Sequence, residues 1–170
     1  GYIGATGGTI RINNFDIVEE PEKAKKCIGY LPEIPPVYPD MTVKEYLLFT
    51  AELKGIKKTD KIESVAKVSE MTHLEEVENR LIKNLSKGYR QRVGLAQAIM
   101  GFPEVIILDE PTVGLDPKQI TEIRTLIKEL GKEHTIILSS HILSEVSAVC
   151  DQIMIISKGR LVAQDTAENL

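Results

Sequence analysis

The chain has 170 residues, of which 42% are hydrophobic and 27% charged, and its formal net charge is -4. This length suits one domain with a substantial core, and the composition is ordinary for a globular protein. The acidic balance argues against a nucleic-acid-binding surface as the main function. Because no run of 18 apolar residues and no charged-then-apolar leader occurs, we expect a cytosolic protein or the cytosolic part of a larger one.

The first 31 residues alternate turns with short predicted elements. Residues 1–8 are rich in glycine and lead into a predicted strand at 9–12, which the Asn13-Asn14 turn closes. The glycines do not form a phosphate-binding loop, because no lysine follows Gly7 or Gly8. A helix is predicted at 21–26 and a strand at 27–31. We interpret the two cysteines as small buried residues rather than a disulfide pair: Cys27 and Cys150.

Helices dominate the middle of the chain, after a proline-rich loop at 33–40. Thr42, with Glu45 three residues on, predicts a capping box at the start of a helix over 43–54. A second amphipathic helix is predicted over 60–71. Four residues are expected on its apolar side: Ile62, Val65, Ala66 and Val68.

Beyond residue 101 the pattern alternates between strands and helices. The predicted strands are 105–109, 135–140 and 152–157, the predicted helices are 117–132 and 142–149, and a hairpin at Gly159 leads into 161–163. Alternation of this kind predicts an α/β fold with a parallel sheet and right-handed crossovers.

Two adjacent carboxylates follow the most apolar strand. Residues 105–108 are apolar and mostly β-branched, which predicts a strand buried on both faces. Asp109 and Glu110 come where that strand ends, the edge at which α/β sheets bind ligands. Successive residues point to opposite sides, so one acid can hold a metal ion while the other reaches a water. The alternative is a core strand followed by a solvated acidic turn.

Two further polar clusters are candidates for the same site. Ser86 is a good N-cap for a helix running to residue 100, and Gly88 in its first turn allows close approach of a ligand, which together indicate an anion site. An ordinary capped helix with a solvated basic face is the alternative. His141 follows the strand at 135–140 and is expected beside the two acids, whereas His73 and His134 are interpreted as surface or boundary residues.

Taken together, these residues resemble the nucleotide-binding domain of ATP-binding cassette (ABC) proteins. Residues 105–110 resemble the Walker B strand with its catalytic glutamate, residues 114–116 (Gly-Leu-Asp) resemble the D-loop, and His141 resembles the switch histidine. Residues 85–89 (Leu-Ser-Lys-Gly-Tyr) resemble the signature motif, usually Leu-Ser-Gly-Gly-Gln. Glu33 stands where the Q-loop usually has glutamine. The departures at Lys87, Tyr89 and Glu33 are similar to those of exporter-type subunits.

The resemblance implies a P-loop NTPase-like parallel sheet core with an inserted helical subdomain. The family's Walker A loop and the strand before it are not found in the sequence, so we expect a cassette that lacks its first strands and its Walker A helix. The expected division is a remnant of the N-terminal β region and a core strand (1–32), a Q-loop and helical subdomain ending in the signature motif (33–92), and a core lobe with Walker B, D-loop and switch histidine (93–170).

The resemblance also implies a role for each site residue, with ATP and Mg²⁺ as cofactors. Asp109 would hold Mg²⁺, Glu110 would polarise the attacking water, and His141 would contact the γ-phosphate. Glu33 would sense the water and bind the metal. Ser86 and Gly88 would close over the γ-phosphate of the nucleotide bound by the other protomer of a head-to-tail dimer. Asp116 and Glu33 are also expected among the cofactor-binding residues. Without Walker A, we expect residues 1–170 alone to bind ATP weakly and not to hydrolyse it.

The implied function is that of the ATPase subunit of an ABC transporter. Its expected partners are a second nucleotide-binding domain and a membrane permease, with no nucleic acid, at the cytoplasmic face of the cell membrane. A cassette ATPase acting on ribosomes or DNA is an alternative, and a non-catalytic interaction fragment is another. About 52 residues separate Glu33 from Leu85, which leaves room for a helical subdomain but not for a long coiled coil.

Overall fold

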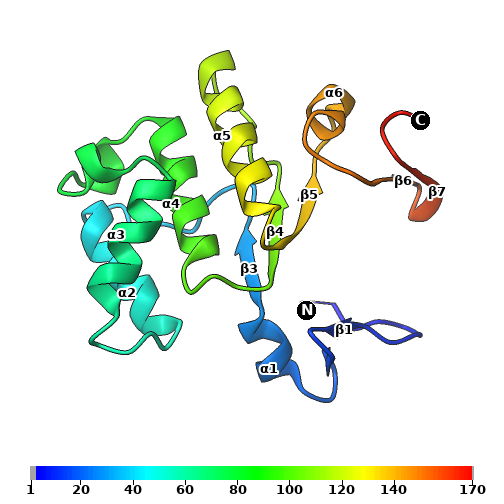
Figure 1. The fold of residues 1–170 in the computed structure, drawn as a ribbon, viewed down its shortest axis with the longest axis horizontal. Coiled ribbons are helices and arrows are strands. Elements are labelled where there is room, and N and C mark those ends of the chain that lie inside the picture. The colour runs from blue at the N-terminus through cyan, green and yellow to red at the C-terminus, as the bar shows by residue number, and fades with distance from the viewer. Residues whose placement is uncertain (1–2, 170) are drawn as a thin grey trace.

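The computed structural model describes residues 3–169 and is built around a three-stranded parallel sheet in the order β3-β4-β5 (Figure 1). The strands are β3 (Ile28–Leu31), β4 (Val105–Asp109) and β5 (Thr135–Ser139). In register, Leu31 lies opposite Leu108, and Leu108 lies opposite Leu138. The carboxyl ends of β4 and β5 therefore meet at one edge, as the alternating pattern predicts.

The N-terminal part is a small antiparallel hairpin followed by a helix. Strands β1 (Arg11–Ile12) and β2 (Phe15–Asp16) join through Asn13 and Asn14, both of which have positive φ, and α1 (Pro21–Lys26) follows. The strand predicted at 9–12 is therefore half as long, because the hairpin pairs only two residues on each side. Residues 1 and 2 of the glycine-rich turn lie outside the described part.

The helical part comprises α2 (Val43–Leu53), α3 (Lys61–Met71), the short 3₁₀ turns η1 (Glu75–Val77) and η2 (Ile82–Asn84), and α4 (Lys87–Ile99). The predicted capping box is present: the Thr42 side chain accepts from the Glu45 N–H, and the Glu45 carboxylate accepts from the Thr42 N–H. Buried apolar residues of α2, α3, η1, η2 and α4 belong to one core cluster.

The apolar side predicted for α3 is half wrong. Val65 and Val68 are buried, but Ile62 is 74% exposed and Ala66 is also exposed. The helix contacts α2 and α4 along one narrow stripe, which runs through Val65, Val68 and Ser69. Residues 62 and 66 are one helical turn apart and lie on the opposite, solvated side.

Only one face of the sheet is fully covered. Helix α5 (Pro117–Leu130) and helix α4 cover the face that carries Ile106 and Leu108, both fully buried. On the other face Tyr30, Ile107 and Ile137 stand in register side by side, and Ile137 is 48% exposed. The prediction that β4 is buried on both faces is therefore wrong, because no helix among residues 3–169 covers the row that contains Ile107.

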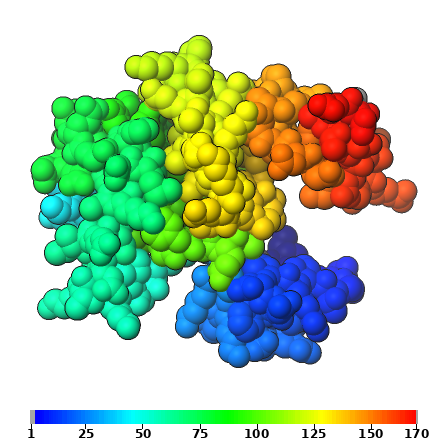
Figure 2. Space-filling view, viewed as in Figure 1, coloured from blue at the N-terminus to red at the C-terminus, as the bar shows by residue number. Residues whose placement is uncertain are grey.

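The C-terminal elements extend away from this body. Helix α6 (Leu143–Ser147) is shorter than the predicted helix over 142–149, and β6 (Ile153–Ser157) pairs antiparallel with β7 (Arg160–Asp165) rather than with the parallel sheet. Figure 2 shows this hairpin at one end of the molecule, separated by a notch from the N-terminal residues. Within residues 3–169, no helix has the length and apolar character needed to cross a bilayer.

Candidate functional site

The acids that follow β4 make separate contacts at the edge of the sheet. Asp109 ends β4 and accepts a hydrogen bond from the Ser139 hydroxyl, at the end of β5. The next residue, Glu110, donates its backbone N–H to the Ser139 carbonyl at 3.1 Å and has a left-handed φ of 47°. This backbone conformation, which side chains other than glycine rarely adopt, turns Glu110 away from Asp109. The two carboxylates thus face different partners, as strand alternation predicts.

Glu110 is held against His141. Its Oε1 lies 2.8 Å from His141 Nδ1 and 3.0 Å from the His141 backbone N–H. A carboxylate can only accept, so the ring donates its Nδ1 proton to Glu110. The hydrogen bond and the negative charge of Glu110 raise the pKa of His141 above its ordinary value of 6.5. The structure therefore places His141 beside the acids, where the sequence predicts it.

Glu33 approaches the same edge from the neighbouring strand. It lies in the loop that follows β3, and its side chain is exposed. Its negative charge is among the smaller causes that raise the pKa of His141, as is that of Glu145. The carboxyl ends of all three parallel strands thus contribute acidic or basic groups to one place.

The oxygen atoms at this edge suit Mg²⁺. Glu110 Oε2 is buried and has no hydrogen-bond partner among residues 3–169, so its hydrogen-bonding capacity is unsatisfied in this arrangement. Within the same residues, no group of three or more His, Cys, Asp or Glu side chains could form a complete metal site. Mg²⁺ needs none, since it commonly binds one or two carboxylates together with water and substrate phosphates. Asp109 and Glu33 fit that ligand chemistry.

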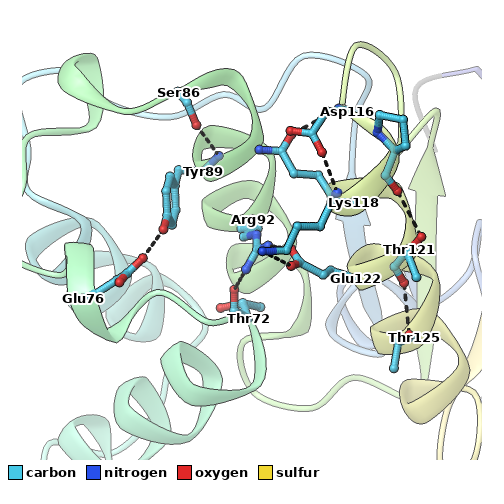
Figure 3. Close-up of polar contacts among 12 residues, drawn as sticks. Thr72, Glu76, Ser86, Tyr89, Arg92, Asp116, Lys118, Thr121, Glu122 and Thr125 are labelled. Atoms are coloured by element: carbon cyan, nitrogen blue, oxygen red, sulfur yellow. Dashed lines mark hydrogen bonds and ion pairs between the residues drawn. The ribbon is translucent and has the colours of Figure 1, made fainter.

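A second cluster surrounds the start of α4 (Figure 3). Ser86 is the N-cap, and its hydroxyl accepts the Tyr89 N–H at 3.3 Å, as predicted. Gly88 is buried, and a Cβ there would lie 2.5 Å from Gln119 Nε2. The space that the sequence interpretation left for a ligand is thus filled by Gln119. The glycine is needed because α4 and α5 begin in contact.

Asp116 connects this cluster to the D-loop-like turn. Its carboxylate accepts the Gln119 N–H at 2.9 Å and forms a capping box at the start of α5. The Lys87 side chain lies over Gly114, where a Cβ would be 2.0 Å from the Lys87 ammonium. The residues of the signature-like and D-loop-like motifs therefore form one contact surface. Nucleotide contacts for Ser86, Gly88 and Asp116 stay a prediction.

Sequence reasoning missed the polar contacts that fix α4. Arg92 is largely buried and pairs with Glu122 of α5, and its guanidinium also reaches the Thr72 carbonyl at 3.5 Å (Figure 3). The Tyr89 hydroxyl bonds to Glu76, which raises the pKa of that phenol. Each pair joins residues far apart in the sequence, so no local pattern could have indicated them.

The sequence profile of the family described as "ABC transporter" matches residues 1–113. The chain belongs to this family. Among similar ABC proteins, the bacitracin transport ATP-binding protein BcrA of Bacillus licheniformis is 38% identical over all of this chain and 55% of its own length. The ABC transporter ATP-binding protein NatA of Bacillus subtilis is 34% identical over 96% of this chain and 67% of its own length.

Solved ABC structures agree with the fold. The ATP-binding subunit of an ABC transporter superposes with a TM-score of 0.86 at 29% identity, covering 99% of this chain and 71% of that one. The cbiO1 protein of Clostridium perfringens, part of the ABC transporter complex cbiONQ, gives 0.87 at 28% identity, covering 96% and 68%. The chain thus has the P-loop NTPase fold of ABC ATPases. It spans about half the length of BcrA, 55%.

Proposed function

We propose that this chain supplies the metal-binding and water-activating side of an ABC ATPase site, and that the subunit containing it powers a transporter. The observation that carries the proposal is the Glu110–His141 contact at the carboxyl edge of β4 and β5, with Asp109 beside it. ATP-binding subunits of this family are ATPases in general, and the relatives named as transport ATP-binding proteins favour a transporter over a ribosome- or DNA-acting cassette.

Each residue at the sheet edge has a chemical task. Asp109, with help from Glu33, would hold Mg²⁺, which when bound neutralises charge on the phosphates. Glu110 would polarise the attacking water through its carboxylate, whose Oε1 also holds the His141 ring. The raised pKa of His141 favours the protonated ring. That ring donates from Nδ1 to Glu110 and keeps Nε2–H for a γ-phosphate oxygen.

The start of α4 would serve a nucleotide held by a second cassette. The helix has 13 residues, its first N–H groups carry a partial positive charge, and Ser86 is exposed at its tip. In a head-to-tail dimer, the Ser86 hydroxyl and the backbone N–H of Gly88 would close over the γ-phosphate of the partner's nucleotide, with Asp116 beside them. The side of Gly88 that would carry a Cβ instead faces Gln119. The tight contact between α4 and α5 would hold these residues at a fixed position.

A membrane permease would dock beside the proline-rich loop, with the chain at the cytoplasmic face of the membrane. Ile34 and Tyr38 are exposed there, and the Tyr38 ring packs edge-on against Tyr46 and Phe49 of α2, at 6.0 and 5.6 Å between ring centroids. An apolar surface on a stiff loop suits such a contact. Ile34→Asp is expected to reduce co-purification with the membrane subunit, and unchanged co-purification would contradict this docking site.

The ATPase proposal is tested by hydrolysis kinetics in a protein that joins this chain to a Gly-x-x-x-x-Gly-Lys-[Ser/Thr] loop. Glu110→Gln keeps the shape of the side chain but loses its basicity, so kcat is expected to fall by about 10²–10⁴. Glu129→Gln is the matched control, because Glu129 lies on the exposed side of α5 and, within residues 3–169, its one ion pair is with Lys132. Equal kcat values for wild type and Glu110→Gln would overturn the proposal.

Residues 1–170 tested alone provide a separate arm. We expect no measurable Mg²⁺-dependent hydrolysis, because most of the positioning of phosphates in this chemistry comes from the loop that the sequence does not contain. Hydrolysis by residues 1–170 that Glu110→Gln abolishes would contradict this expectation. Absence of activity in both proteins would favour a non-catalytic interaction role.

A further inference from the structure

Helix α6, which follows His141, is held by a buried carboxylate. The helix has five residues, and Glu145 is the only buried one; its side chain is 9% exposed. Leu143 is exposed, and Ile142, the N-cap residue of α6, makes no side-chain capping bond. Apolar packing therefore contributes little to holding α6 in place, and the polar contacts of Glu145 contribute more.

Those contacts come from two other elements. The hydroxyl of Thr112, also buried, donates to Glu145 Oε2, and Arg124 Nη2 of α5 lies 3.8 Å from Glu145 Oε1. With Leu138 and Ser140 at the end of β5, these three residues line a small, partly open pocket. A buried carboxylate is stable only when it is paired and hydrogen-bonded, so this arrangement is specific rather than incidental.

The cluster joins the two sides of the Glu110–His141 contact. Thr112 lies two residues after Glu110, and Glu145 lies four residues after His141. His141 itself is 70% exposed, and an exposed ion pair contributes little to holding a chain segment in place. The buried Thr112–Glu145 bond provides a further constraint on the distance between the two segments, beside the two contacts of Glu110 with His141.

We propose that Glu145 is a positioning residue, whose carboxylate, fixed by Thr112 and Arg124, holds the turn after β5 so that the His141 imidazole meets Glu110. Its consequence for catalysis rests on the proposed ATPase function, whereas the positioning itself does not. Neither Thr112 nor Glu145 touches the reacting atoms in this assignment.

Thr112 offers a matched pair of substitutions that separates positioning from packing. Thr112→Val keeps the volume and the branched shape but removes the hydroxyl, whereas Thr112→Ser keeps the hydroxyl and removes a methyl group. If the hydrogen bond positions His141, Thr112→Val disrupts the Glu110–His141 contact and Thr112→Ser preserves it. If only packing matters, Thr112→Ser disrupts the contact and Thr112→Val preserves it.

The readout is the ¹⁵N chemical shifts of the His141 ring in residues 1–170 at fixed pH, which report the bond from Nδ1 to Glu110. The Glu110→Ala variant provides the reference for the broken contact. Thr112→Val and Glu145→Gln are expected to move the ring shifts toward that reference. Thr112→Ser is expected to keep the wild-type values, as is Ser144→Ala at an exposed position of the same helix.

Wild-type ring shifts in folded Thr112→Val and Glu145→Gln would overturn the inference, and so would equal changes in Thr112→Val and Thr112→Ser. If Thr112→Val does not fold, Glu145→Gln decides alone. In the joined protein, misplacing His141 is expected to lower kcat by up to about 10²-fold with KM for ATP unchanged. Ring shifts that move without any change in kcat would count against a catalytic role for His141. A joined protein that hydrolyses no ATP would count against the ATPase function, and both results leave the positioning role intact.

Discussion

The molecule has an inner block, from β3 through α5 (residues 28–130), and an outer segment, from β5 through β7 (residues 135–165), and the two are stabilised differently. Among residues 3–169, all of the largest fully buried side chains lie in the inner block, among them Leu47, Leu95 and Ile106. In the outer segment, every residue of which is described, only Glu145 and Ile153 are buried. The inner block has a core of its own, and the outer segment buries few side chains against it.

The candidate site crosses this boundary. Asp109 and Glu110 leave the most deeply buried strand, whereas His141 belongs to the outer segment and depends on polar contacts for its position. Glu110 follows a buried strand and His141 lies in an exposed segment. This difference suits a site in which His141 responds to the nucleotide while Glu110 stays in place. The difference in burial can be tested directly, because each region offers side chains of similar size for substitution.

The largest expected effect is in the inner block. Leu47→Ala removes a fully buried side chain from α2 and should lower the free energy of unfolding by about 2–5 kcal/mol, from lost burial and the cavity left behind. Ile156→Ala on β6, where the side chain is 70% exposed, should change it by less than about 0.5 kcal/mol. Urea unfolding followed by circular dichroism measures both. Similar losses of unfolding free energy in the two variants would contradict the difference in burial between the inner block and the outer segment.

Close approach of α4 to β3 provides a smaller effect within the inner block. A Cβ on Gly29 would lie 2.0 Å from the Ala98 carbonyl oxygen, which is backbone and cannot move aside easily. Gly29→Ala should therefore cost about 1–3 kcal/mol of unfolding free energy through overpacking. Gly7→Ala is the control, because a Cβ there meets nothing within 4 Å. If Gly29→Ala were as stable as Gly7→Ala, the inner block would be looser than the contacts indicate.

The contrast between the regions also explains what the sequence could predict. Local patterns identified the inner block well: the Thr42–Glu45 capping box, the Ser86 N-cap and β4 are where the sequence places them. These depend on residues within one or two turns of each other. Prediction was weaker where burial depends on what lies across the sheet. In the part of the chain that the structure describes, no neighbouring element covers the face of the sheet that carries Ile107 and Ile137. The same holds for Ile62 on α3.

The candidate site was likewise predictable where it depends on the order of the strands, and not where it depends on contacts between distant residues. The order of strands was enough to predict that His141 meets Glu110, because parallel strands end at a common edge. Nothing local indicated the pair Thr112–Glu145, whose members are 33 residues apart. A carboxylate one helical turn beyond a candidate histidine could have raised the question, but only the fold shows that it is buried. Gly88 had a local explanation that the structure replaces, since Gln119 occupies the space beside it.

The smallest expected effect is the contact that crosses the boundary. The pKa of His141 is raised in the folded chain by Glu110, so the native state binds the proton more tightly than the unfolded chain does. The resulting stability is fully present below the unfolded value of 6.5 and is lost as pH rises through the higher folded value. Urea unfolding of wild type and His141→Gln on either side of that range measures it. Wild type should lose stability relative to His141→Gln as pH rises, and the Glu110→Gln background should remove most of this difference, because Glu110 is the largest cause of the raised pKa of His141. A difference that persists at full size without the Glu110 charge would mean that Glu145 and Glu33 hold the proton on His141, and that the Glu110 contact does not join the two regions.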